Sequence, residues 1–140
     1  SFRSRTMKFA VLILAIVSVV HCGIDAFVTV KGTLTCKEPF HYEMEMREAE
    51  PLAQKLEIMA RLAPRKSVNN KADFFITGKG SEFWLGDNEI EPRLYIKHTC
   101  GGLDKCICKD LGDVSCDLET SLNVDLTKPD WTSLKECKDC

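Results

Sequence analysis

The feature that most restricts the fold of this 140-residue chain is its eight cysteines. Cytosolic proteins are kept reduced and rarely carry so many, whereas small secreted domains use cysteine pairs to brace a small core. Six of the eight, from Cys100 onwards, lie in the last third of the sequence, and Cys36 stands alone near the start of the expected mature chain. A bridge from Cys36 would therefore close a loop of roughly sixty residues or more and would stabilise the fold by on the order of 4 kcal/mol in the chain-entropy model.

We expect at least three intramolecular disulfides. The spacing does not determine which cysteines pair, and as a working pairing we take Cys100 with Cys116. Without Cys22 the number of cysteines is odd, so one thiol is free, or it pairs with another chain, or Cys22 is kept in the mature protein. The candidates are Cys36, Cys100, Cys106, Cys108, Cys116, Cys137 and Cys140.

Two short motifs, Cys106-Ile-Cys108 and Cys137-Lys-Asp-Cys140, also resemble zinc knuckles. Neither has the paired C-x2-C spacing of a zinc ribbon, and an oxidising compartment favours disulfides, so we expect no metal site. The second motif could also be a redox pair, but thiol exchange favours a helix N-terminus, where the helix dipole lowers the thiol pKa. We expect it instead to staple the C-terminal tail.

The N-terminal region has the layout of a secretory signal peptide. Met7 and Lys8 precede an apolar run that ends at Val20, and Asp25 prevents its extension. That run is shorter than the roughly 20 apolar residues that cross a membrane. We therefore expect residues 1–22 to be upstream sequence and a cleaved signal peptide, a secreted extracellular product and no transmembrane segment.

The charge of the remaining chain argues against nucleic acid as a partner. Residues 1–22 carry three basic residues and no acidic residue, so the net charge of −2 for the whole chain becomes −5 beyond them. Dispersed acidic charge does not suit a phosphate backbone or an anionic lipid surface. The sequence contains no phosphate-binding loop, serine elbow, zinc-protease motif or calcium loop, and we expect no cofactor.

Apolar and polar residues alternate along several short stretches, which predicts β-strands. In 27–36, Val28, Val30, Leu34 and Cys36 share one face, with threonines and a lysine on the other. Further strands are expected at 42–47, 74–78, 93–98 and 122–127.

Two segments are harder to assign. In 51–63, leucine and methionine recur at helical spacing, but part of the segment also fits a strand. The cysteine-rich stretch 101–116 shows no sustained periodicity and is expected to be a loop. Five or six short strands with at most one short helix predict a β-sandwich.

The opening strand, Val28-Thr-Val-Lys-Gly-Thr-Leu-Thr-Cys36, resembles that of the transthyretin-like proteins, a secreted family abundant in nematodes. The strand Leu94-Tyr-Ile-Lys-His-Thr-Cys100 and the block 122–130 are also similar to that family. The resemblance covers most of residues 27–131. The chain departs from the family pattern in 38–70, in the longer insert after Cys100 and in the tail.

This resemblance implies an all-β, transthyretin-like (immunoglobulin-like) antiparallel β-sandwich of about seven strands over 27–131, stapled by disulfides and followed by a cysteine-containing tail at 132–140. It implies a non-enzymatic binding or adaptor protein that presents loops to an extracellular protein, lipid or small apolar ligand. Edge strands of such folds can pair, which leaves a homo-oligomer open.

Two alternative functions remain. One is a hydrolase of the same fold, since related hydroxyisourate hydrolases share it, although they end in Tyr-Arg-Gly-Ser and this chain ends in Lys-Asp-Cys140. The other is a disulfide-rich effector whose loop between Cys100 and Cys116 inhibits an enzyme.

The candidate binding residues are Phe83, Trp84 and Leu85, because an exposed aromatic loop can anchor a partner or a membrane interface. The alternative, which we favour, is that Trp84 caps the core, since large aromatic side chains are mostly buried. His41 and His98 show no partner of the kind a catalytic base needs, so we assign no catalytic residue.

Overall fold

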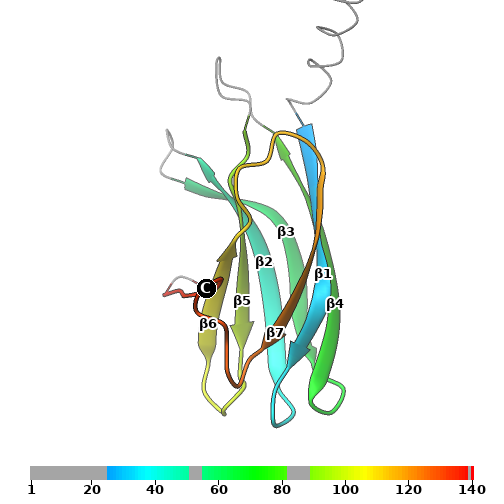
Figure 1. Cartoon of the computed structure of the whole chain (residues 1–140), viewed down its shortest axis with the longest axis vertical. Helices are drawn as coiled ribbons and strands as arrows, with labels where there is room; N and C mark the ends of the chain where they lie inside the picture. The colour runs from blue at the N-terminus through cyan, green and yellow to red at the C-terminus, as the bar shows by residue number, and fades with distance from the viewer. Residues whose placement is uncertain (1–24, 51–54, 82–88, 139) are drawn as a thin grey trace, which may run out of the picture.

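The computed structural model describes residues 25–50, 55–81, 89–138 and 140, which form eight strands in two sheets (Figure 1). No helix occurs in these ranges, so the expected all-β class is confirmed. The strands are β1 (Asp25–Thr35), β2 (His41–Glu50), β3 (Lys55–Lys66), β4 (Lys71–Ser81), β5 (Pro92–His98), β6 (Lys105–Asp110), β7 (Leu118–Asp125) and β8 (Lys135–Glu136).

The two sheets differ in size and in strand direction. The smaller has the order β4-β1-β7, in which β1 is antiparallel to β4 and parallel to β7. The larger has the order β3-β2-β5-β6-β8 and is antiparallel throughout. The prediction of a purely antiparallel sandwich is therefore wrong for β7, because β7 follows β1 in the same direction instead of returning along it.

A single hydrophobic core lies between the sheets. The alternation predicted for 27–36 is confirmed, since Val28, Val30 and Leu34 of β1 are fully buried. From the larger sheet, Met44 and Met46 of β2 and Leu94 and Ile96 of β5 join the same buried cluster. Burial of these side chains is the main favourable contribution to folding.

Gly32 lets β1 and β7 approach each other closely. A Cβ atom at this position would lie 1.7 Å from the carbonyl oxygen of Leu122 on β7. Only glycine fits such a close approach of two backbones. The glycine in the middle of the opening strand is thus explained by the parallel neighbour.

The helical alternative for 51–63 is wrong over the part that the structure describes. Residues 55–63 belong to β3, and 51–54 lie outside the described residues. Leu62 pairs with Met44 and Ala60 with Met46, so the spacing that resembled a helix belongs to a strand with register shifts. Such irregularities break the period-two pattern that identifies a strand in a sequence.

The cysteine-rich stretch also differs from the prediction of a loop. Part of it forms β6, which pairs with β5 on one side and with the short strand β8 on the other. β6 places only Ile107 and Cys108 in buried positions and is otherwise polar, so it carries little apolar alternation.

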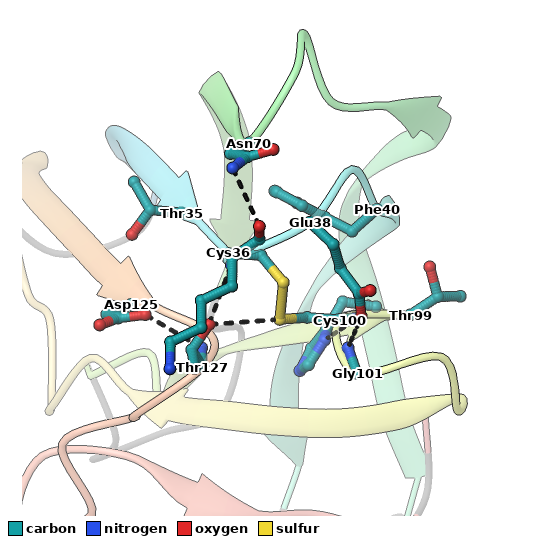
Figure 2. Close-up of a disulfide and its surroundings, with 12 residues drawn as sticks. Thr35, Cys36, Glu38, Phe40, Asn70, Thr99, Cys100, Gly101, Asp125 and Thr127 are labelled. Carbon is teal, nitrogen blue, oxygen red and sulfur yellow. Dashed lines mark hydrogen bonds between the residues drawn. A yellow bond between two sulfur atoms is a disulfide. The ribbon is translucent and has the colours of Figure 1, made fainter.

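Three disulfides join cysteines within the described ranges, in agreement with the expected minimum, and they pair Cys36 with Cys100, Cys106 with Cys140, and Cys108 with Cys137. The working pairing of Cys100 with Cys116 is wrong, because Cys100 closes the long loop back to Cys36 (Figure 2). Cys116 is also disulfide-bonded.

The expected signal peptide falls on residues 1–22, which lie outside the described part of the chain. Within the described ranges, no helix is long and apolar enough to span a bilayer.

Candidate functional site

A groove of about 620 Å³ runs over the outer face of the larger sheet. We call it the outer groove. The chain's last residue, Cys140, contributes to its lining, because the C-terminal segment returns to the sheet beside β6 (Figure 1). Its polar lining residues are Glu43, Glu45, Arg47, Arg61, Tyr95 and Lys97.

The strand pleat places these side chains outside. Successive residues of a strand point to opposite faces, so Glu43, Glu45 and Arg47 lie outside where Met44 and Met46 lie in the core. On β5, Tyr95 and Lys97 are outside by the same rule. Tyr95 pairs with Glu45 across the two strands, which brings the aromatic ring beside the charged row.

Glu45 is the centre of a charge cluster in this groove. Its two carboxylate oxygens accept hydrogen bonds from Nε of Arg47 and, at 2.8 Å, from Nε of Arg61. Partial burial raises the pKa of the Glu45 carboxyl, but the hydrogen bonds and charges of the two arginines outweigh burial, and the pKa is lowered. Glu45 is therefore an anion at any physiological pH.

Arg47 also covers the aromatic ring of Tyr95. Its guanidinium carbon lies 4.0 Å from the ring centroid, within the range of a cation–π contact. Tyr95 is only 6% exposed although it lies on the outer face. The floor of the groove is thus the ring of Tyr95, which the guanidinium of Arg47 covers. The carboxylate of Glu45 holds that guanidinium in place.

Lys97 completes the charged lining, with its ammonium 3.5 Å from a carboxylate oxygen of Glu43. The polar lining then has three cations and two carboxylates. Paired side chains of both signs can bind a polar segment of another molecule by exchanging partners.

A smaller pocket of about 170 Å³ lies at one end of the larger sheet, lined in part by His41, Lys97, His98 and Asp104. His98 itself is buried, and its Nδ1 accepts a hydrogen bond of 3.1 Å from the backbone N–H of Cys100. Its Nε2 is buried without a hydrogen-bond partner. Burial, with a smaller effect of the Lys105 charge, lowers the pKa of His98 to about 4.

His98 is therefore neutral at physiological pH. Cys100, two residues further on, is bonded to Cys36 and offers no thiolate nucleophile. His41, by contrast, is exposed.

The remaining predicted site residues are the aromatic binding residues and the cysteines of the two possible zinc motifs. Phe83, Trp84 and Leu85 lie outside the described residues. The sulfurs of the two possible zinc motifs are joined in disulfides, and within the described ranges no three metal-ligating side chains come together.

Sequence reasoning missed the outer groove. The charged residues of β2 were visible as the polar face of a strand, but nothing in the sequence shows that Arg61 lies across from Glu45. That relationship depends on the register of β2 and β3.

No family model, curated protein or solved structure matches the chain. The class of protein is defined by its own structure. The described residues form two packed β-sheets braced by disulfides, with a charged groove on the outside of the larger sheet.

Proposed function

We propose that this chain is a secreted, non-enzymatic binding or adaptor protein of transthyretin-like type, and that the outer groove binds a segment of an extracellular protein. The three disulfides are compatible with an oxidising extracellular environment. The resemblance of the opening strand supports the family assignment.

The groove is the observation that carries this proposal. Its volume of about 620 Å³ falls within the range of ligand sites. Its charged side chains are held by ion pairs and by the Arg47–Tyr95 contact, so little ordering is needed when a partner binds. Tyrosine and arginine are also the residues that most often dominate binding energy in protein interfaces.

The hydrolase alternative has less support among the described residues. A general base needs a pKa near the working pH and access to the substrate. His98 is buried with a pKa of about 4, and Cys100 is oxidised.

The experiment is a comparison of charge-reversed variants as bait. The secreted protein, immobilised, is exposed to extracellular fluid, and bound proteins are identified by mass spectrometry. Arg61→Glu and Lys97→Glu reverse exposed cations of the outer groove. Lys31→Glu is the matched control, because Lys31 is an ion-paired lysine on the smaller sheet whose exposure lies between those of Lys97 and Arg61.

We expect a partner that wild type and Lys31→Glu retain and that both groove variants lose. Retention by all four proteins, or equal loss from the control, would reject the outer groove as the binding surface.

A further inference from the structure

Four cysteines gather at one edge of the larger sheet. Cys106 and Cys108 are two residues apart on β6, so both project to the outer face on either side of the inward-facing Ile107. The C-terminal segment brings Cys137 and Cys140 to them. The Cα atoms of the two bonded pairs are 5.7 Å and 6.0 Å apart.

The strand register does not match the sulfur pairing. Ile107 lies opposite Glu136 and Cys108 opposite Lys135, so the next antiparallel pair sets Cys106 opposite Cys137. The backbone N–H of Cys137 donates to the carbonyl of Cys106 at 3.0 Å, as that pairing requires. Yet Cys137 is bonded diagonally to Cys108, and Cys106 reaches onward to Cys140.

The same four sulfurs can therefore pair in a second way. Residues directly opposite in a hydrogen-bonded antiparallel pair have Cα atoms about 5.5 Å apart. Disulfides span Cα separations of about 4.4–6.8 Å. A thiol released at Cys106 would thus lie within bonding range of Cys137 without movement of the strands.

The exposure of each cysteine indicates which disulfide an external thiol can attack first. Cys140 is exposed and Cys106 half-buried, whereas Cys108 is buried, as are Cys36 and Cys100 of the inter-sheet bridge. Exchange depends on access to the attacked sulfur, so the bridge that contains the exposed Cys140 is the one that an external thiol should reach first.

A lysine lies directly across the strand pair from Cys106, the residue whose sulfur would leave. Lys97 of β5 is the cross-strand partner of Cys106, and both side chains are on the outer face. Its charge is partly offset by Glu43 at 3.5 Å. A neighbouring ammonium stabilises a thiolate, and a stabilised leaving group departs faster.

We propose that these four cysteines form a thiol–disulfide exchange site, in which an external dithiol opens Cys106–Cys140 and the freed Cys106 then displaces Cys108 from Cys137. In the first step a thiolate of the dithiol bonds to Sγ of Cys140, and Cys106 leaves with the electron pair. In the second, the Cys106 thiolate bonds to Sγ of Cys137, and Cys108 leaves as the thiolate.

The second thiol of the reductant then resolves the mixed disulfide at Cys140. The reductant becomes a cyclic disulfide, and two electrons and two protons pass to the protein. The product carries a Cys106–Cys137 bond and thiols at Cys108 and Cys140.

The test is a map of the partly reduced protein. The full, oxidised chain is treated with limiting dithiothreitol, quenched in acid, labelled with N-ethylmaleimide at low pH and digested without reduction. We expect the first label on Cys108 and Cys140, a new peptide linking Cys106 to Cys137, and opening at least about tenfold faster than that of Cys36–Cys100.

First labels on Cys106 and Cys140 with Cys108–Cys137 intact would overturn the exchange step. Opening of Cys36–Cys100 first, or at the same rate, would overturn the site. The matched control is the double variant Cys108→Ser, Cys137→Ser, which removes the second disulfide, so that the label must fall on Cys106 and Cys140. The wild-type map decides between these outcomes even if the variant does not fold.

Discussion

Cys36, one residue beyond β1, is bonded to Cys100, two residues beyond β5, and this bond joins the smaller sheet to the larger one. Figure 2 shows the polar contacts around it. The backbone N–H of Cys36 donates to the carbonyl of Asn70, and that of Gly101 donates to the carboxylate of Glu38. The disulfide and these two hydrogen bonds therefore hold together the segments that meet at this end of the sandwich.

Replacing both members of this bridge, Cys36→Ala with Cys100→Ala, is expected to lower the free energy of unfolding by about 4 kcal/mol. The bridge spans 64 residues, and removing it returns that loop's conformational freedom to the unfolded chain. Urea unfolding followed by tryptophan fluorescence measures the change. A loss below about 1 kcal/mol would contradict the chain-entropy account.

His98 is expected to make stability depend on pH between about 4 and 6.5. In the unfolded chain the imidazole takes up a proton near pH 6.5, but in the fold burial lowers its pKa to about 4. The favourable contribution of neutral His98 to the free energy of unfolding is therefore complete above pH 6.5 and is lost as the pH falls to 4. The difference corresponds to roughly 3 kcal/mol.

His98→Asn tests this origin, because the asparagine side-chain oxygen can replace Nδ1 as acceptor for Cys100 but does not titrate. The variant's unfolding free energy, measured by urea titration from pH 4.5 to 7, should vary less with pH than that of the wild type. His41→Asn, at an exposed position, serves as control and should keep the wild-type slope. An unchanged slope in His98→Asn would assign the effect to another group.

The strands that were predictable from sequence are those whose inward faces are continuously apolar, such as β1 with Val28, Val30 and Leu34. Their pattern follows from burial alone. β6 was not predictable, because Ile107 is its only inward apolar side chain between two outward cysteines. The β3 segment was ambiguous because its register against β2 shifts twice.

The cysteine pairing and the outer groove could not be predicted for a related reason. Both depend on which strands become neighbours, and neither Cys36–Cys100 nor Glu45–Arg61 is close in the sequence. Local patterns specify a strand's faces, whereas these contacts arise from sheet order.

Gly32→Ala is expected to destabilise the protein by more than about 3 kcal/mol, because the new methyl group would lie 1.7 Å from the carbonyl oxygen of Leu122 and must push β1 from β7. Gly78→Ala is the graded comparison, since its methyl group would meet Met59 at 3.0 Å and needs a much smaller shift. Thermal unfolding by circular dichroism ranks the two. Equal effects would show that close approach to β7 is not the constraint at residue 32.

Glu45→Gln is expected to lower the free energy of unfolding by about 1 to 2 kcal/mol, because it removes a carboxylate that accepts hydrogen bonds from two arginines. The lowered pKa of Glu45 means that this contribution is held above pH 4.5 and is lost as the pH falls below it. Glu119→Gln, which breaks an exposed pair with Lys31, should cost less than about 0.5 kcal/mol. Urea titrations at pH 7 compare them, and equal losses would contradict a special role for the cluster.

The parallel pairing of β1 with β7 also governs when the chain can fold during its synthesis. Thr33 of β1 contacts Asn123 of β7 across 90 residues of sequence. The middle strand of the smaller sheet must therefore wait for one of its two neighbours until the residues of β7 have been synthesised. Contacts so distant along the chain form slowly, so the smaller sheet is expected to close late in folding.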